Sequence, residues 1–388
     1  MKSFYTDLHI HIGRTKSGKP VKITASRNLT LPAVIEYASK QKGLDMIGII
    51  DCHSPEVIME MEELIEQGKM IELPSGGVKM EGITIILGSE LEIYDSSCKG
   101  PIHVLSYLPT LAKMKEFSNW ISNHMKNVTL SSQRLYITGK ELQHKVKELN
   151  GLFIPAHIFT PFKSLYGSGV YRSYKEVLDE KLIDGMELGL SSDTDMADQI
   201  SELHAFSFIT NSDAHSLGKI AREYQIMEME EASFAEFAKV LHQVEGRRII
   251  ANYGLDPKLG KYHETVCMKC YAPFSETTGI CKECGSHKWV KGVAARITDL
   301  KDATSTANRP PYIHQIPLEY IPGLGKKTLQ TLLDYFSTEM QIIHEAPYDK
   351  LVEIIPKKVA DYVVAARTGM LNLQVGGGGK YGKVRVDK

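Results

Sequence analysis

The sequence predicts an α/β protein with appended modules, and three observations support this prediction. Up to about residue 255, short apolar runs with strand character alternate with amphipathic stretches of helical spacing. Residues 256–297 are instead rich in cysteine, lysine and glycine, and residues 312–375 have a helical pattern. Because 388 residues exceed the usual size of one domain, we expect one large core with smaller units attached.

The elements of the first part follow from local patterns. The apolar runs 46–50, 83–87 and 152–156 are short, which predicts buried strands of a largely parallel sheet that closes as a barrel. Helical spacing predicts helices over 31–42 and 234–244. We therefore expect strands alternating with helices, and an active site where the loops after the strands converge.

A mostly helical insertion, Leu111 to Leu149, lies between His103 and His157. Within it, Thr138-Gly-Lys-Glu forms a capping-box pattern that predicts the start of a helix. The insertion carries scattered Lys, Arg and His residues. It is either a lid or substrate arm, or a helical decoration with a solvated basic face, and the pattern leaves both open.

Side chains that can bind metal recur beside the predicted strands. In Asp7-Leu8-His9-Ile10-His11, the two histidines lie two residues apart, so a strand places them on one face. The further candidates are Asp51, His53, Glu90, His103, His157, Asp213 and His215. Burying so many polar groups is costly unless a metal cluster compensates. Such ligands suit zinc, manganese or iron, and a carboxylate such as Glu90 can bridge two ions.

Cys267, Cys270, Cys281 and Cys284 form two Cys-x-x-Cys pairs. In a reducing compartment, this spacing predicts one tetrahedral structural zinc ion rather than disulfides. Lysines and an aromatic residue, including Lys288 and Trp289, surround the cysteines. That surface suits nucleic acid, although many zinc ribbons mediate only protein contacts.

The segment Ile321 to Thr328 lies between helical stretches and is similar to the hairpin of helix-hairpin-helix proteins. Its Gly323 and Gly325 would expose backbone N–H groups to a phosphate, and Lys326 and Lys327 add positive charge. Residues 353–360 look like a degenerate second copy without the glycines. These features predict sequence-independent DNA binding.

Three further segments complete the chain. Residues 298–311 are a polar linker, and residues 376–388 are a glycine-rich basic tail that we expect to be flexible. Residues 330–336 distantly resemble a peptide that binds a replication sliding clamp, although the segment fits an amphipathic helix better. A sliding clamp is therefore a candidate partner.

The ordered set of histidines and carboxylates resembles the PHP (polymerase and histidinol phosphatase) family over roughly the first 255 residues. This resemblance implies a PHP-type distorted (β/α)7 barrel with phosphoesterase activity and up to three metal ions. By position, it implies a first ion held by His9, His11, Glu90 and Asp213, and a second held by Glu90, His103 and His157. It implies that His53 and His215, with Asp51, hold the third.

Asp7 and Cys52 lie beside the implied ligands but are not among them. Asp7 is not expected to bind metal directly, and it would orient a neighbouring imidazole. Cys52 separates Asp51 from His53, whereas many PHP proteins have adjacent Asp and His residues. The ligand in this segment is therefore open, and Cys52 is either a participant or a small buried thiol at a strand end.

The barrel, the four-cysteine module and the helix-hairpin-helix-like tail together resemble the endonuclease Q family. This resemblance implies a DNA repair endonuclease that uses metal-activated water to cut 5′ to uracil, hypoxanthine, xanthine and abasic sites. It implies one structural zinc ion and two or three Zn²⁺, Mn²⁺, Mg²⁺ or Fe²⁺ ions in the barrel. A small-molecule phosphatase of the histidinol phosphate type and a non-catalytic DNA-binding scaffold are the alternatives.

Several further residues near the candidate ligands offer cations or aromatic faces to DNA. They are Arg134, Tyr166, Tyr171, Arg172, Lys219 and Arg222. The net charge of -1 gives no global preference for nucleic acid. No apolar run approaches the length that crosses a bilayer and no signal peptide begins the chain, so we expect a cytoplasmic, nucleoid-associated monomer.

Overall fold

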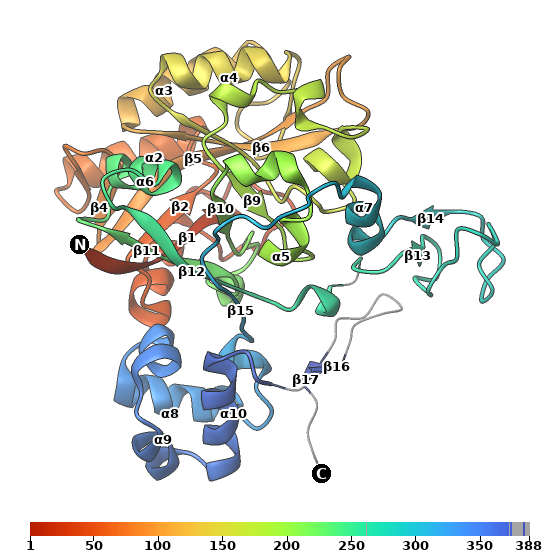
Figure 1. Cartoon of the computed structure of the whole chain (residues 1–388). Coiled ribbons are helices and arrows are strands. Elements are labelled where there is room, and N and C mark those ends of the chain that lie inside the picture. The colour runs from red at the N-terminus through yellow and green to blue at the C-terminus, as the bar shows by residue number, and fades with distance from the viewer. Residues whose placement is uncertain (261, 372, 375–382, 385–388) are drawn as a thin grey trace.

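The computed structural model describes residues 1–260, 262–371, 373–374 and 383–384, and Figure 1 shows three parts. The first 255 residues form a large α/β body. The cysteine-containing segment extends from one side of this body, and a group of helices near the C-terminus lies below it. The α/β prediction is confirmed. Most of the predicted tail, 376–388, lies outside the described residues.

The main sheet contains the long strands of the body, in the order β15-β12-β11-β1-β2-β5-β4-β3, with β6 and β7 joined to β5 and β8 joined to β6. Its strands are β1 (Lys2–Ile10), β2 (Met46–Ile49), β3 (Ile71–Glu72), β4 (Val78–Met80), β5 (Ile83–Ile93), β6 (Ile102–Leu108), β7 (Arg134–Leu135), β8 (Leu152–Pro155), β11 (Tyr224–Met229), β12 (Arg248–Gly254) and β15 (Tyr312–His314). Separate pairs are β9 (Met186–Leu188) with β10 (Phe208–Thr210), β13 (Val266–Cys267) with β14 (Trp289–Val290), and β16 (Leu373–Gln374) with β17 (Lys383–Val384).

The sheet is mixed, which corrects the expectation of a largely parallel one. Strands β1, β2 and β5 are parallel neighbours, but β6 runs antiparallel to both β5 and β8. The reason is the connection of residues 94–101, because a parallel pair needs a crossover of a dozen or more residues. As a consequence, His103 lies at the start of β6 and does not follow a strand.

The helices are α1 (Leu31–Glu36), α2 (Pro55–Glu66), α3 (Leu111–Ser122), α4 (Gly139–Glu148), α5 (Thr194–Ala197), α6 (Phe234–His242), α7 (Val293–Leu300), α8 (Lys326–Phe336), α9 (Tyr348–Ile354) and α10 (Lys357–Arg367). The predicted helix 31–42 appears as α1 continued by the short helix η1 (Tyr37–Lys42). The capping box between Thr138 and Glu141 is formed at the start of α4. None of the helices described here has the length and apolar content needed to cross a membrane.

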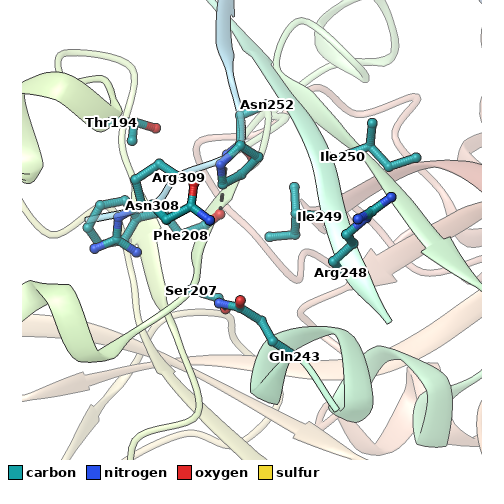
Figure 2. A pocket seen from close by; sticks show the side chains of 11 residues that line it. Thr194, Ser207, Phe208, Gln243, Arg248, Ile249, Ile250, Asn252, Asn308 and Arg309 are labelled. Atoms are coloured by element: carbon teal, nitrogen blue, oxygen red, sulfur yellow. Dashed lines mark hydrogen bonds between the residues drawn. The ribbon is translucent and has the colours of Figure 1, made fainter. Parts of the chain in front are cut away.

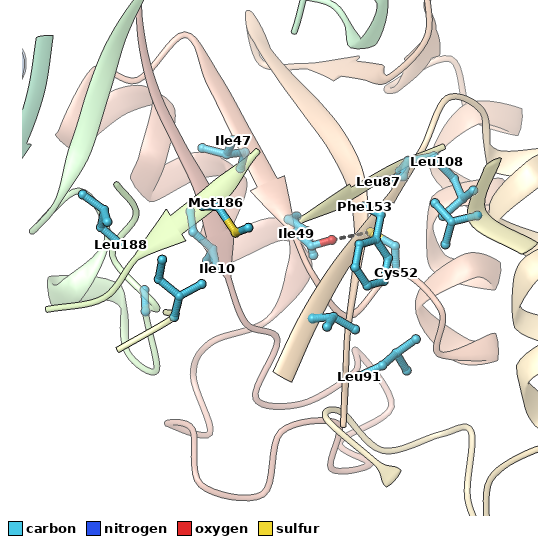
Figure 3. Close-up of a cluster of buried hydrophobic side chains, with 14 of the residues drawn as sticks. Ile10, Ile47, Ile49, Cys52, Leu87, Leu91, Leu108, Phe153, Met186 and Leu188 are labelled. Atoms are coloured by element: carbon cyan, nitrogen blue, oxygen red, sulfur yellow. Dashed lines mark hydrogen bonds between the residues drawn. The ribbon is translucent and has the colours of Figure 1, made fainter. Parts of the chain in front are cut away.

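A buried apolar cluster lies among the strand ends that carry the candidate ligands (Figure 3). Ile10, Ile49 and Leu91 come from β1, β2 and β5, and Met186 comes from β9. Cys52 belongs to this cluster and its Sγ donates a hydrogen bond to the carbonyl of Ile49 over 3.0 Å. The interpretation of Cys52 as a small buried thiol is therefore the one that the structure supports.

The helices near the C-terminus have a core of their own, which includes Leu332, Ile342 and Val363. The short helix η9 (Gln341–Glu345) attaches this unit to the body. There, the ring of His344 stacks on Tyr5 with ring centroids 4.9 Å apart. Nearby, Lys42 Nζ lies 2.8 Å from Glu339 Oε2 and both side chains are almost fully buried. These contacts join the two units through packed rings and a buried ion pair.

The predicted linker 298–311 is anchored to the body. The guanidinium of Arg309 donates to Asp198 Oδ1 over 3.0 Å and to the carbonyl of Leu203 over 2.9 Å. It also lies 3.8 Å from the ring centroid of Phe208, in the wall of a cavity at the start of β10 (Figure 2). That cavity is at the opposite end of β10 from Asp213, so it is separate from the ligand candidates.

Glu223 generates a prediction about stability. Burial raises the pKa of its carboxyl group to about 8, because a charged group loses hydration in the interior. The folded-state pKa lies above the unfolded-state value, so ionising Glu223 is more costly in the folded protein. The free energy of unfolding is therefore highest below about pH 4.5 and decreases as the pH rises to about 8. We expect Glu223→Gln to remove this loss and to raise the free energy of unfolding at pH 8.5 by a few kcal/mol, roughly.

Denaturant unfolding of both proteins at pH 5 and pH 8.5 checks this expectation. The variant should gain much more stability at pH 8.5 than at pH 5. An equal difference at the two pH values would contradict it.

Candidate metal centre

The first ligand candidates lie where β1 and β10 end side by side. His9 lies in β1, next to the last residue of the strand, and His11 follows the strand. A parallel bridge joins Ile10 to Ala214, next to Asp213. The Ala214 carbonyl accepts from the His11 backbone over 3.2 Å, and the Ala214 N–H donates to the His9 carbonyl over 3.1 Å. These backbone bonds bring two distant segments of the sequence to one site.

Glu90 lies within β5 at the centre of the site. Its Oε1 lies 2.8 Å from His103 Nδ1 and 3.3 Å from His157 Nε2. On the other side, the Nε2 atoms of His9 and His11 lie 3.7 Å and 3.6 Å from its two oxygens. A single buried carboxylate therefore faces four imidazoles.

Two of the ligand candidates have unusual backbone conformations. His157 has φ of 32° and Asp213 has φ of 45°, and positive values are uncommon for residues other than glycine. Such strain persists only where the surrounding structure imposes it, and it concentrates at functional sites. Both residues follow strands, where the loop must turn sharply to direct the side chain into the site.

Three groups of these side chains have ligand atoms within 4.8 Å of one another. The groups are His9, His11 and Glu90; His11, Asp213 and His215; and Glu90, His103 and His157. Among the described atoms, several in these groups are buried without a hydrogen-bond partner: His9 Nε2, His11 Nε2, His103 Nε2 and Asp213 Oδ1. Unpaired buried polar atoms are costly. Divalent ions would satisfy them, and this mixture of nitrogen and oxygen donors fits zinc, manganese or iron.

The charges of the site reinforce one another. Burial alone would raise the pKa of Glu90, but the positive charges of His103 and Lys22 outweigh burial and hold this pKa well below its usual value. Burial would lower the pKa of His9, but the carboxylates of Glu187, Asp213 and Glu90 outweigh it and raise this pKa to about 10. Glu90 and Asp213, whose pKa values are both held well below the usual range, are therefore ionised and create a negative potential that attracts cations.

Glu187, in β9, orients His9 and was missed in the sequence. Its carboxylate lies 2.9 Å from His9 Nδ1 and accepts from Asn211 Nδ2 and from the His157 backbone N–H, each over 2.8 Å. A hydrogen bond at Nδ1 leaves Nε2 of His9 available to a metal. The available signal was an isolated glutamate in the short apolar run 186–190.

Asp7 does not have the role that was predicted for it. Its Oδ1 accepts from the backbone N–H of Ser212 over 3.1 Å and its Oδ2 accepts from that of Ala221 over 2.9 Å. Burial raises the pKa of Asp7 to about 6, and these hydrogen bonds act in the opposite direction. Asp7 therefore holds the loop around Asp213, while Glu187 orients the imidazole.

Asp51 and His53 lie outside the three groups. Asp51 Oδ2 accepts from the Ile12 backbone over 2.7 Å and lies 3.1 Å from His11 Nδ1, so it orients His11. His53 Nδ1 lies 2.8 Å from Ser89 Oγ and its Nε2 lies 3.4 Å from the Leu130 carbonyl. Their assignment to a third ion stays a prediction that these contacts do not favour.

The helical insertion and the loop after His11 both reach the site. Ser131 Oγ lies 3.2 Å from His11 Nδ1, and Ser132 Oγ donates to Glu90 Oε2. Lys22 Nζ donates to the same Glu90 oxygen over 3.1 Å and to Ser132 Oγ over 2.5 Å. Its polar loop contacts two candidate ligands, so the insertion is more than a solvated decoration, and its role as a lid or substrate arm stays a prediction.

The residues expected to contact DNA differ in their availability. Tyr166 is fully buried and its hydroxyl donates to Glu202 over 2.7 Å, which corrects its predicted role as a stacking surface. Arg222 Nε donates to the Ser212 carbonyl over 2.8 Å and braces the loop before Asp213. Lys219 Nζ lies 2.6 Å from Glu319 in the C-terminal unit.

Three other candidates are exposed. Tyr171 and Arg172 lie in the loop that follows His157. Arg134 lies between two aromatic rings, 4.8 Å from the Tyr94 centroid and 5.3 Å from that of Tyr136. These three side chains stay candidates for contact with DNA.

The glycine segment near the C-terminus leads directly into α8. Gly323 has φ of 84°, a conformation that favours glycine, and Gly325 is the residue before the helix. Lys326 and Lys327 are exposed at the first positions of α8. Residues 330–336 also lie within α8, and Leu332 is buried in its core, which supports the alternative of an amphipathic helix over a clamp-binding peptide.

The four cysteines cluster as their spacing predicts. Cys267 Sγ lies 3.6 Å from Cys284 Sγ, and Cys270 Sγ lies 3.5 Å from Cys281 Sγ. The backbone N–H groups of Cys270 and Lys269 lower the pKa of the Cys267 thiol, which favours the thiolate that binds metal. Trp289 stacks on Phe274 with centroids 5.9 Å apart, so part of its face is covered within the module.

Helix α7 connects the cysteine module to the loop after His157. Arg296 donates to the carbonyls of Tyr166, Val170 and Tyr171 over 2.8, 2.9 and 2.8 Å. The chain enters α7 soon after β14 of the module. The module and the loop are therefore held together by a charged side chain that satisfies three carbonyls at once.

Comparisons with known proteins agree with this architecture. No protein-family model matches the chain. The Bacillus subtilis protein YqxK is 54% identical over 386 residues, which cover 99% of this chain and all of that protein. The crystal structure of the lesion-specific endonuclease PfuEndoQ from Pyrococcus furiosus superposes with a TM-score of 0.85 at 32% identity, covering 99% of this chain and 96% of that one.

A second solved structure shows endonuclease Q in complex with a 27-mer duplex that has an abasic lesion at the active site. It has a TM-score of 0.85 and 32% identity, and the match covers 100% of this chain and 97% of that one. The likeness thus includes the body, the cysteine segment and the C-terminal helices.

The contacts of Glu187 predict a specific defect in metal binding. Glu187→Gln keeps the size of the side chain but removes the charge that orients His9, so we expect about 10-fold to 100-fold weaker binding of Mn²⁺. Calorimetric titration of the full chain measures this affinity. Glu202→Gln is the matched control, because Glu202 accepts hydrogen bonds away from the three groups. Equal affinities of the two variants would contradict the orienting role.

The cysteine cluster predicts a separate loss. Cys281→Ser removes one of four thiolates, so we expect it to lower the zinc content by one ion per chain, since zinc prefers a closed tetrahedral site. Elemental analysis of purified protein measures the loss. Cys98→Ser is the control because Cys98 lies outside the cluster. An unchanged zinc content in Cys281→Ser would refute the site.

Proposed function

The chain belongs to the endonuclease Q family, and we propose on this premise that it is a metal-dependent DNA repair endonuclease that cuts 5′ to damaged nucleotides. The proposed lesions are uracil, hypoxanthine, xanthine and abasic sites. The observation that carries the proposal is Glu90, a buried carboxylate shared by two groups of imidazoles. A carboxylate between two such groups can hold two ions close together, and two neighbouring ions are the arrangement used in two-metal phosphoester hydrolysis.

The proposed architecture of residues 1–255 is a PHP-type distorted barrel of β1, β2, β5, β6, β8, β9 and β10. Closure of this barrel is supported by backbone contacts between strands that do not pair in the sheets described above. The Ile158 N–H donates to the Glu187 carbonyl over 3.0 Å, between the segments of β8 and β9, and the bridge from Ile10 to Ala214 links β10 to β1. A ring closed in this way would surround the buried ligands.

For the remaining units we propose the boundaries expected from the sequence. Residues 256–297 would be the zinc module, 298–311 the connection, 312–375 the helix-hairpin-helix-like unit and 376–388 a basic tail. Gly323, Gly325, Lys326 and Lys327 would place backbone N–H groups and positive charge on the DNA backbone, because the start of a helix attracts phosphate. Such contacts position the duplex without selecting its sequence.

The chain's own residues divide the catalytic work. His9, His11, Glu90 and Asp213, with His103 and His157, would hold the ions, and Glu187 and Asp51 orient the imidazoles. Ions bound there would supply hydroxide near neutral pH and neutralise charge on a phosphoryl group. Lys22 holds a positive charge beside Glu90 and keeps one of its oxygens in place. A damaged base pairs poorly, so extruding it from the duplex is less costly than extruding a normal base.

Two alternatives predict different products. A small-molecule phosphatase would release phosphate from monoesters without DNA, and a scaffold would bind DNA without turnover. The Glu90 constellation argues against a scaffold. The match of the appended modules to a duplex-bound endonuclease Q argues against the phosphatase.

Matched duplexes separate these possibilities. With Mn²⁺ or Mg²⁺, we expect the full chain to cut strands containing uracil, hypoxanthine or an abasic site, and to leave the undamaged strand intact. Glu90→Gln should lower the rate at least 100-fold, roughly, because the shared carboxylate holds both ions, whereas Glu202→Gln should retain it. Mapping product ends on sequencing gels locates the cut. Equal cutting of damaged and undamaged strands would disprove the repair function.

A further inference from the structure

A cavity of about 330 Å³ lies at the end of β10 that is remote from the metal centre (Figure 2). This volume is typical of a site for a small ligand. The cavity is enclosed by the starts of β10 and α5, by β12, and by the connection that leads to β15. The described residues that line it include none of the candidate metal ligands. The cavity is therefore a separate site.

Two buried side chains in the cavity have a polar atom without a partner among the described atoms. They are Asn252, with Oδ1 unpaired, and Thr194, with Oγ1 unpaired, and their exposed fractions are 0% and 3%. The Asn252 amide is oriented by Nδ2, which donates to the Phe208 carbonyl over 3.4 Å, so Oδ1 is left as an acceptor. Unpaired buried polar atoms are costly. A ligand with an N–H donor would satisfy Asn252, and the hydroxyl of Thr194 can donate or accept.

The inner wall between these polar atoms is apolar and held in place. Phe208 and Ile249 are both buried there. The guanidinium of Arg309 lies 3.8 Å from the Phe208 ring centroid. Its donors are engaged by Asp198 and by backbone carbonyls of the body, so Arg309 is a fixed part of the wall. Apolar walls with a few placed polar groups suit a planar heterocycle.

The rim of the cavity is positively charged. The side chain of Arg248 is 65% exposed, and its Nη2 lies 2.9 Å from Glu228 Oε2. A guanidinium has five N–H groups, so this contact leaves Arg248 able to bind an anion as well. No carboxylate side chain is found among the described residues that line the cavity. A ligand with a negative group at the rim would therefore meet attraction and no direct repulsion from the walls.

The course of β12 sets the distance between the rim and the inner wall. Ile250 is an extra residue opposite β11, and such a bulge lets Ile249 and Ile250 both line the cavity. Arg248 and Asn252 lie at the two ends of this stretch, with Cα atoms roughly 13 Å apart at the rise of an extended strand. A ligand that reaches both must have a hydrogen-bonding ring at one end and an anionic group at the other.

We propose that this cavity binds a nucleoside 5′-monophosphate. The base lies against Phe208 and Ile249 and donates an N–H to Asn252 Oδ1, and the phosphate pairs with the guanidinium of Arg248, which matches phosphate geometry. The bound nucleotide also contacts the connection of residues 308–310, which forms one wall, and so strengthens its attachment to the body. This binding requires neither DNA nor an occupied metal centre.

Calorimetric titration of the full chain with adenosine 5′-monophosphate tests the site, and we expect one molecule bound per chain. Adenosine lacks the phosphate and ribose 5-phosphate lacks the base, so each should bind about tenfold more weakly or worse. Glu90→Gln alters the metal centre and should leave the affinity for the nucleotide unchanged. Absence of binding at millimolar nucleotide, equally tight binding of either fragment, or loss of binding in Glu90→Gln would overturn the proposal.

Variants of the rim and the inner wall assign the contacts. Arg248→Gln should weaken binding of the nucleotide about tenfold, because a charge-assisted hydrogen bond is lost, and should leave adenosine binding unchanged. Thr194→Val keeps the shape of the side chain and should weaken both ligands about fivefold. Arg172→Gln is the matched control, because Arg172 is exposed in another loop and does not line the cavity.

The exposed position of Arg248 keeps the test decisive. If circular dichroism shows that Thr194→Val is unfolded, Arg248→Gln decides, because an exposed rim side chain is not needed for packing. Unaltered affinity of Arg248→Gln for the nucleotide would overturn the proposal. A protein that binds the nucleotide but cuts no damaged strand would contradict only the proposed nuclease function, since the titration contains no DNA.

Discussion

The structure depends on the cost of burying the Glu90 carboxylate. A charged carboxylate loses its hydration in the interior, and this loss is tolerable only where opposite charges and hydrogen bonds replace water. His103, His157 and Lys22 provide that replacement within 3.3 Å. Each of these residues comes from a different segment, so the body must bring these segments together before the carboxylate can be accommodated.

A second layer of polar contacts makes the arrangement rigid. Glu187 orients His9, Asp51 orients His11, and Asp7 holds the loop around Asp213. The positive φ values of His157 and Asp213 are maintained by the same layer. The apolar cluster of Figure 3 lies among the strands that carry these side chains. The site is therefore preorganised, which is what a charged reaction centre needs.

The appended units are bound to the body through a few charged and aromatic side chains. Arg296 ties α7 to the loop after His157, Arg309 fixes the connection that runs back to the sheet, and His344 stacks on Tyr5. These contacts explain how a small cysteine module and a separate helical core keep defined positions on the body. A duplex in contact with either unit would thus be held in a defined position relative to the metal centre.

The sequence by itself determined the α/β class and the cysteine cluster, and it identified the side chains that form the three ligand groups. These features depend on short spacings. Alternation along a strand points His9 and His11 to the same face, and the Cys-x-x-Cys spacing places two thiolates together. Only the tertiary structure decided the antiparallel course of β6, the burial of Tyr166, and the roles of Glu187, Asp51 and Lys22. Those outcomes depend on contacts between segments far apart in the chain, such as His9 with Glu187, and no local pattern encodes which distant partner a side chain meets.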